Sequence, residues 1–231
     1  MHEYSDAKLG SFIVTGGNVL DHLDRLSRES SANFIIQHLD KAELHLDRDS
    51  LYKKVIVELG NLPTGLFLEF GVWQGGTINI WADNLGPNCI NNKVYGFDSF
   101  EGLRNTWSYP GIGKGSFNLN GVVPENLENP KIEIIQGWVE ETLPEFLSLN
   151  SDSISFVHFD LDVYEPTKFA LENMKSKLNH MALILFDEMI GFPGWEHGEF
   201  KALNEVFNQE EYEWVGFSNR QALIRIVKSA N

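Results

Sequence analysis

Apolar residues recur along the chain with two different periods, and the change between them divides the sequence. Between residues 18 and 59 the apolar positions recur at helical spacing, which predicts helices throughout this part. The last of them runs from about Leu51 to Leu59, with Asp49 or Ser50 as its cap. The segment 61–65, NLPTG, ends the helical part. We therefore predict two parts, an N-terminal helical cap region (1–60) and a second domain (61–231).

The second part predicts a mostly parallel sheet. Short apolar runs alternate there with amphipathic stretches of helical period, which is typical of buried parallel strands with helices on both faces of the sheet. The predicted strands are Leu66–Phe70, Val94–Phe97, Ile132–Ile135, Ile154–Phe159 and Ala182–Phe186. The predicted helices between them are Thr77–Leu85, Val139–Leu149 and Pro166–Leu178.

The end of the chain follows a different order. A predicted helix, Glu199–Phe207, is followed by two strands, Glu213–Phe217 and Ala222–Val227, with only a four-residue connection between them. Such a short connection predicts an antiparallel hairpin at one edge of the sheet. The fold class is therefore α/β: a Rossmann-like sheet, mostly parallel, with an antiparallel C-terminal hairpin strand and additional N-terminal helices.

Composition restricts the partners and the compartment. The net charge of −15 argues against nucleic acid and anionic membranes, because both bind basic patches. The single cysteine, Cys89, excludes an intrachain disulfide and a cysteine-based zinc site, and it favours a reducing cytosol. Residues 1–12 carry acids where a secretory leader carries bases, and the apolar run 181–186 is too short to span a bilayer. We expect a cytoplasmic protein without a membrane partner. Whether it forms a homo-oligomer stays open.

The segment 66–77, LFLEFGVWQGGT, is the most informative stretch for function. Glu69 ends an apolar run, and Gly71 and Gly75 precede a predicted helix, so backbone N–H groups can approach a ligand closely. The dinucleotide fingerprint G-x-G-x-x-G is absent, because Glu69 replaces its first glycine. A carboxylate here would repel a pyrophosphate but suits a cationic or zwitterionic ligand such as S-adenosylmethionine. A tight turn with glycines for packing is the alternative.

Acidic residues gather at the ends of three predicted strands: Asp98, then Asp160 with Asp162, then Asp187 with Glu188. In an open α/β sheet these ends lie along one crevice. An acid in the position of Asp98 usually accepts hydrogen bonds from ribose hydroxyls. Asp160, Asp187 and Glu188 have no neighbouring histidine or cysteine partner and suit a hard divalent cation. Helix caps and turns are the alternative roles.

Two further features point to the same crevice. The long connection 99–130 is rich in glycine and proline and starts at the carboxyl end of a strand, so it is either a substrate-side loop or a surface excursion. Trp138 follows Gly137 at the end of the third strand, where its ring can face an adenine or pack in the core.

These motifs together resemble class I S-adenosylmethionine-dependent methyltransferases, and among them the macrocin O-methyltransferase family. The resemblance covers about residues 60 to 228. It depends on EFGVWQGGT (69–77), VYGFDSFEGL (94–103), IIQGWVEETLP (134–144), FVHFDLDVYEPT (156–167), LILFDE (183–188) and GFSNRQALIRI (216–226). It implies that the domain 61–231 is an S-adenosylmethionine-dependent, Mg²⁺-dependent O-methyltransferase acting on a sugar or another small-molecule hydroxyl.

The resemblance also implies roles for individual residues. Those bordering the methionine end of the cofactor would be Glu69, Gly71, Gly75 and Thr77. Asp98 and Ser99 would hold the ribose, and Gly137 and Trp138 would flank the adenine. The metal ligands would be Asp160, Asp187 and Glu188, although the family commonly has two aspartates at the last two positions. Asp162 is the candidate base, and Asp160 and Asp162 could exchange roles.

Two other function classes compete with this interpretation. An NAD-type oxidoreductase is disfavoured by the missing fingerprint, and binding of S-adenosylhomocysteine rather than NADH would separate the two. A non-catalytic binding module on the same fold predicts a broken metal site. The presence of all four acids, Asp160, Asp162, Asp187 and Glu188, argues against it.

Overall fold

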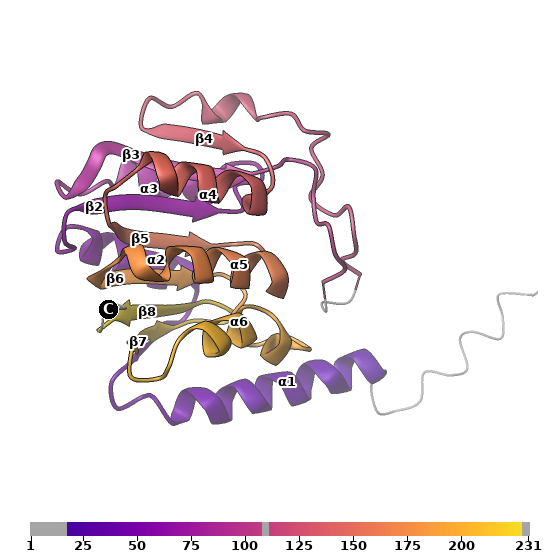
Figure 1. The fold of residues 1–231 in the computed structure, drawn as a ribbon. Helices are drawn as coiled ribbons and strands as arrows, with labels where there is room; N and C mark the ends of the chain where they lie inside the picture. The colour runs from indigo at the N-terminus through magenta and orange to yellow at the C-terminus, as the bar shows by residue number, and fades with distance from the viewer. Residues whose placement is uncertain (1–17, 108–110, 228–231) are drawn as a thin grey trace, which may run out of the picture.

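The computed structural model describes residues 18–107 and 111–227, and a twisted eight-stranded sheet forms the centre of this part (Figure 1). The strand order is β1-β7-β8-β6-β5-β2-β3-β4. The strands are β1 (Glu43–Leu44), β2 (Gly65–Phe70), β3 (Cys89–Asp98), β4 (Ile132–Gln136), β5 (Ile154–Phe159), β6 (Leu178–Phe186), β7 (Tyr212–Phe217) and β8 (Ala222–Ile226). All residues of β2 and β5 are buried, as expected for strands covered on both faces.

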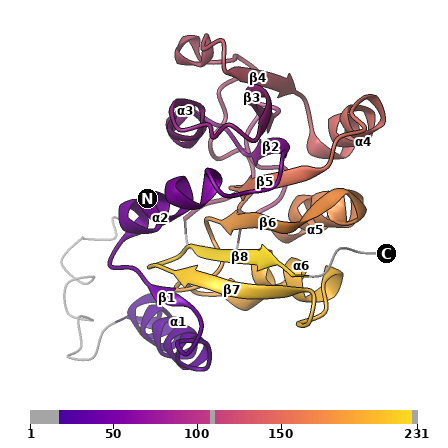
Figure 2. The same cartoon turned by 90° about the vertical axis from the view of Figure 1, so that its left-hand side faces the viewer.

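Helices cover both faces of the sheet. Figure 2 shows α2 and α3 on one face and α4, α5 and α6 on the other, with α1 beside the edge that β1 and β7 form. The helices are α1 (Val19–Ile36), α2 (Arg48–Leu59), α3 (Gly76–Asp83), α4 (Val139–Leu149), α5 (Tyr164–Met174) and α6 (Glu199–Val206). Short 3-10 helices lie at Glu125–Leu127, Lys175–Lys177 and Trp195–His197. The predicted α/β sheet with helices on both faces is confirmed.

The C-terminal hairpin is present, and its second strand lies inside the sheet. β8 pairs antiparallel with both β6 and β7, while all other pairs are parallel. β7 is therefore parallel to the rest, and only β1 lies beyond it. The hairpin extends the sheet beside β6. The strands β2, β3, β5 and β6 are parallel to one another, so their carboxyl ends lie at one edge.

The predicted helical region 18–59 is interrupted. α1 ends at Ile36, and Glu43–Leu44 forms a strand whose continuation is tied to β7 by the His45 N–H, 2.8 Å from the Phe217 carbonyl oxygen. Pairing with a distant strand overrides the helical periodicity here. α2 also begins earlier than predicted. Its cap is Asp47, whose carboxylate accepts the Ser50 N–H at 2.8 Å while the Ser50 hydroxyl accepts the Asp47 N–H.

None of the helices in the described ranges is long and apolar enough to cross a bilayer. Residues 1–12, on which the expectation about a leader depends, lie outside these ranges. Both α1 and α2 belong to the same body as the sheet, since Phe34 of α1 packs on Trp214 and α2 contributes to the core over β2. The division of the chain at residue 60 stays a prediction.

Candidate functional site

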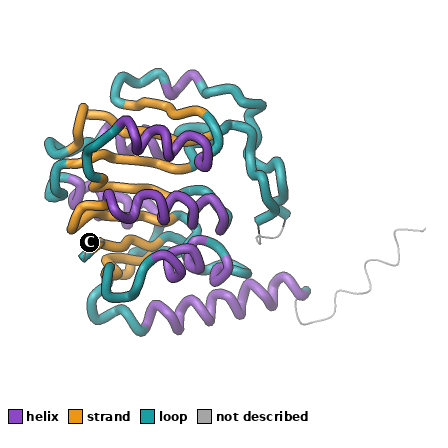
Figure 3. Tube along the Cα trace, in the orientation of Figure 1, coloured by secondary structure: helices purple, strands orange, loops and turns teal. Residues whose placement is uncertain are grey.

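A cavity of about 520 Å³ lies at the carboxyl ends of the central strands. This size is typical of small-molecule sites. The predicted site residues on its wall are Gly71, Asp98, Ser99, Gly137, Trp138, Asp160, Asp162 and Glu188. Residues from 99–107 and 111–117 of the long connection also line the cavity, and these two segments run past the strand ends in Figure 3. The strand-end position inferred from the sequence therefore brings most of the predicted residues together.

Gly71 is the point at which the glycine turn meets the neighbouring strand. Its φ is +83°, and a side chain there would collide with the carbonyl oxygen of Asp160. Its N–H donates to the Phe97 carbonyl oxygen at 2.9 Å. A glycine is needed at this position because the ends of β2, β3 and β5 converge on it.

Asp98 fixes the turn as well as lining the cavity. One carboxylate oxygen accepts the N–H groups of Val72 and Trp73 at 2.8 and 2.7 Å, and the other accepts the Phe100 N–H at 2.7 Å. Charge-assisted bonds of this kind are among the stronger ones in proteins. From the sequence, a turn residue and a ribose ligand were alternative roles for Asp98. The structure shows that Asp98 stabilises the turn and also lines the cavity, so the two roles are compatible.

Glu69 lies behind the cavity wall and is fully buried. Its carboxylate accepts the Thr77 hydroxyl at 2.9 Å and lies 3.0 Å from Nδ1 of buried His158. These contacts tie β2 to α3 and β5. Glu69, Gly75 and Thr77 are thus not on the wall formed by the described residues, and their predicted contact with a cofactor stays a prediction.

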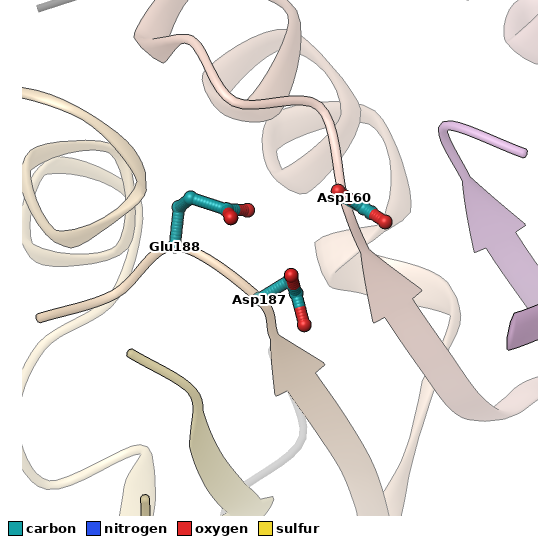
Figure 4. Close-up of side chains that lie close together, drawn as sticks. All are labelled: Asp160, Asp187 and Glu188. Carbon is teal, nitrogen blue, oxygen red and sulfur yellow. The ribbon is translucent and has the colours of Figure 1, made fainter. Parts of the chain in front are cut away.

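The side chains of Asp160, Asp187 and Glu188 lie close together at the ends of β5 and β6 (Figure 4). One oxygen from each lies within 4.8 Å of the others. Two side chains hold Asp187 in place: the Tyr52 hydroxyl and the Gln221 amide each donate to its Oδ1 at 3.1 Å. Oxygens bound to one Mg²⁺ ion at about 2.1 Å lie at most about 4.2 Å apart, so a small adjustment of these side chains would allow all three to bind the same ion.

A fourth acid, Glu199, lies beneath this cluster. It is fully buried, and its Oε2 accepts the Glu188 N–H at 3.0 Å. Within the described part of the chain, Oε2 of Glu188 and Oε1 of Glu199 are buried without a hydrogen-bond partner. Buried carboxylate oxygens without donors are costly unless a cation or a proton neutralises them.

Burial and mutual repulsion act on the protonation of these acids. Burial, followed by the charge of Asp187, raises the pKa of Asp160 and of Glu188 well above the usual range of a carboxyl group. Burial also raises the pKa of Glu199. An all-oxygen donor set that resists ionisation on its own fits a hard divalent cation such as Mg²⁺.

Asp162 follows the cluster in a conformation unusual for a residue other than glycine, with φ +62°. Its side chain is buried, yet it lines the cavity. Burial and then the charge of Asp187 raise its pKa to about 7, while Arg220 opposes this shift. Backbone strain beside a cavity is a feature of functional sites.

Sequence reasoning missed several residues of this site. Trp73 is part of the glycine-turn motif and could have been noticed; it lines the cavity and packs on Phe117 of the long connection, with ring centres 5.6 Å apart. The Arg104 guanidinium lies 3.9 Å from the centre of the Trp138 ring. No local pattern marks Arg48, Tyr52, Glu199 or Arg220.

The family model described as a methyltransferase domain matches residues 68–189. Two curated Streptomyces enzymes are 26% identical. One is 8-demethyl-8-(2,3-dimethoxy-alpha-L-rhamnosyl)-tetracenomycin-C 4'-O-methyltransferase of Streptomyces olivaceus, aligned over 61% of this chain and 59% of its own length. The other is demethyldecarbamoylnovobiocin O-methyltransferase of Streptomyces niveus, aligned over 58% and 56%. The chain thus spans less than two thirds of these relatives.

Solved structures show the same fold. The calicheamicin methyltransferase CalS11 aligns over 97% of this chain and 94% of its own, with a TM-score of 0.63 and 23% identity. Its apo form, described as a TDP-rhamnose 3'-O-methyltransferase, is 26% identical over 78% of this chain and 81% of its own, with a TM-score of 0.56. The match to the family model covers more than half of the chain, so the chain belongs to the methyltransferase-domain family, and its predicted resemblance to class I S-adenosylmethionine-dependent methyltransferases is confirmed.

Proposed function

We propose that the protein transfers the methyl group of S-adenosylmethionine to a hydroxyl oxygen of a small molecule, a sugar hydroxyl in the first instance, with Mg²⁺ bound at the acidic cluster. One observation carries this proposal: a single cavity joins the glycine turn at Gly71 and Asp98 to Asp160, Asp162 and Glu188. Cofactor, metal and base would therefore meet around one acceptor hydroxyl.

The cofactor would lie across the turn. Asp98, oriented by three backbone N–H groups, has remaining acceptor capacity for the ribose hydroxyls, and Ser99 lies beside it. Gly137 and Trp138 would flank the adenine. The sulfonium is cationic, and the acids of the wall favour its binding.

Asp160, Asp187 and Glu188 would hold the metal. When bound, Mg²⁺ would stabilise the negative charge that develops on the acceptor oxygen. Asp162 takes the hydroxyl proton on a carboxylate oxygen as the new oxygen–methyl bond forms and the sulfur–methyl bond breaks. S-adenosylhomocysteine and the methyl ether are the products. The turn and the strand ends supply alignment, the largest contribution the protein itself can make.

The names of related proteins support a sugar acceptor and a metal. The tetracenomycin relative is a 4'-O-methyltransferase of a rhamnosyl compound, and CalS11 is described as acting on TDP-rhamnose. A further protein of this fold, MycE, was solved with Mg, S-adenosylhomocysteine and mycinamycin VI, with a TM-score of 0.53 at 12% identity. A cytoplasmic location and the lack of a nucleic-acid partner remain predictions from composition.

Calorimetry and a transfer assay test the proposal. S-adenosylhomocysteine should bind and NADH should not; the reverse result would favour an oxidoreductase. Methyl transfer to a panel of glycosides should stop in chelator and return with Mg²⁺. Asp187→Asn should lose transfer at the same Mg²⁺ concentration, whereas Asp152→Asn, on an exposed loop, should keep it. Full activity in chelator would contradict the metal assignment.

A further inference from the structure

Arginines are concentrated at this cavity more than the composition of the chain predicts. The chain has six arginines and a net charge of −15, yet three of the six, Arg48, Arg104 and Arg220, line this one cavity. They come from three separate elements: the start of α2, the long connection, and the β7–β8 turn. S-adenosylmethionine carries one carboxylate, which one arginine can bind, and a divalent cation calls for none, so three arginines exceed what these two ligands need.

Two of the three have interactions that account for them. Arg104 stacks on Trp138 and pairs with Glu141 at 3.1 Å, which fixes the long connection to the start of α4. The positive charge of Arg220 attracts the carboxylate of Asp162, which lines the same cavity. Arg48 differs from both, because it forms no ion pair with any carboxylate in the described ranges, and its guanidinium instead lies 5.5 Å from the centre of the Tyr52 ring.

Helix stability does not explain Arg48 either. It is the first residue of α2, where the positive end of the helix dipole disfavours a cation. The cap of this helix is already supplied by Asp47 and Ser50. The positive charge of Arg48 is therefore unfavourable to α2, and the residue lines the cavity.

We propose that the acceptor of the methyl group carries an anionic group, a phosphate or a carboxylate, and that Arg48 binds it. This inference depends on the proposed function, since it names the substrate class of the same site. Guanidinium groups bind both anions through paired hydrogen bonds, and they are less strongly hydrated than ammonium groups. The class comprises sugar phosphates, nucleoside diphosphate sugars and uronic acids.

The position of Arg48 also limits where the anion lies on the acceptor. Tyr52 lies between Arg48 and Asp187: the Arg48 guanidinium lies over its ring, and its hydroxyl donates to the Asp187 carboxylate. Arg48 is thus one tyrosine ring away from a predicted metal ligand. An acceptor hydroxyl at the acidic cluster would place the anionic group roughly one sugar ring from the methylated oxygen.

Binding of four probes tests this inference in the presence of saturating Mg²⁺ and S-adenosylhomocysteine. The probes are glucose 1-phosphate, uridine diphosphate glucose, glucuronic acid and the neutral methyl glucoside. The protein should bind one or more anionic probes more tightly than the neutral one, and the phosphate and carboxylate arms distinguish the two anions. Arg48→Gln should weaken the preferred anionic probe about 10- to 100-fold and leave the neutral probe unchanged.

Two further variants complete the design. Arg48→Lys keeps the charge but loses the paired geometry and should give an intermediate affinity. Lys53→Gln, on the exposed side of the same helix and away from the cavity wall, should change nothing. Three outcomes would overturn the inference. The wild-type protein could bind neutral and anionic probes equally, it could bind no anionic probe, or Arg48→Gln could lower the affinity for neutral and anionic probes by the same factor. Binding of S-adenosylhomocysteine is measured first, and its absence would instead contradict the proposed function and the inference with it.

Discussion

The acids at the glycine turn and the acids at the ends of β5 and β6 lie near the same cavity, but they differ in the hydrogen-bond donors around their carboxylates. Asp98 accepts three backbone N–H groups, and Glu69 has the Thr77 hydroxyl and His158 as partners. We call these two residues the turn acids. Their hydrogen bonds are internal to the protein, so the turn is held in shape by the chain itself.

We call Asp160, Asp187 and Glu188 the strand-end acids. They lie close to one another, and among the described residues only Asp187 of the three has side-chain donors, Tyr52 and Gln221. Oε2 of Glu188 is buried without a partner in the described part of the chain, and the pKa values of Asp160 and Glu188 are raised by burial and by Asp187. The difference indicates that the turn acids have their hydrogen-bond partners within the protein, whereas the strand-end acids need a bound cation to balance their charge. Each of the following predictions tests this contrast.

The largest expected effect is on turnover in Asp162→Asn. The amide keeps the shape of the side chain but cannot take the hydroxyl proton, so turnover should fall by about 10²–10⁴. Affinities for Mg²⁺ and S-adenosylhomocysteine should stay within a factor of about two, since neither contact is assigned to Asp162. Recovery of the rate with excess Mg²⁺ would instead make Asp162 one of the strand-end ligands, and unchanged turnover would leave it as a turn residue.

Gly71→Ala should disturb both groups of acids at once, because Gly71 lies where the turn meets the end of β5. The new methyl group would collide with the Asp160 carbonyl oxygen at a position with φ +83°, so the turn and the end of β5 must both shift. We expect a loss of about 2–4 kcal/mol in the free energy of unfolding and loss of S-adenosylhomocysteine binding. Gly76→Ala is the control, because a side chain at Gly76 meets no heavy atom within 4 Å. Denaturant unfolding of both variants checks this, and equal stability would contradict it.

Tyr52→Phe should affect the strand-end acids alone. It removes the hydroxyl that donates to Asp187 and keeps the ring. Partners that orient a metal ligand are typically worth about 10- to 100-fold in metal affinity, and we expect the lower end because Gln221 also donates to Asp187. Calorimetric titration of Mg²⁺ checks this. Tyr95→Phe, which loses a hydrogen bond with Asn91 on β3, is the matched control and should bind Mg²⁺ normally.

The smallest expected effect is on stability as a function of pH in the absence of divalent cations. The carboxyls of Asp160 and Glu188 have raised pKa values in the folded protein, so the folded state binds more protons than the unfolded state above the ordinary carboxyl range. The free energy of unfolding should therefore rise as the pH is lowered from 8 to 5, by about 1–2 kcal/mol.

Acids whose pKa values are lowered, such as Glu43 and Glu211, do not interfere, because their stabilisation is lost only below the ordinary carboxyl range. Saturating Mg²⁺ should remove most of the slope, and Glu188→Gln should reduce it. Thermal unfolding in chelator at several pH values provides the measurement. If the free energy of unfolding of the metal-free protein instead increases as the pH is raised from 5 to 8, the contrast between the two groups of acids is contradicted.

The sequence by itself determined the alternation of elements and the edge at which the site lies. β5 and α4 begin and end at the predicted residues, Ile154–Phe159 and Val139–Leu149, because a strand buried on both faces and a helix buried on one face each leave a local periodic pattern. The acids at strand ends were predictable for the same reason, since parallel strands bring their carboxyl ends to one edge.

Only the tertiary structure decided the parts that depend on distant partners. Residues 37–46 have a helical pattern, but pairing of Glu43–Leu44 with β7 makes them a turn and a short strand. Glu69 lies behind the cavity wall, where its carboxylate contacts His158, 89 positions away in the sequence. The Tyr52 hydroxyl contacts Asp187, 135 positions away in the sequence, and Arg48 of the same helix lines the cavity. Local sequence patterns cannot predict such contacts, because the packing of whole helices and strands positions each of these side chains and its neighbours in the chain do not.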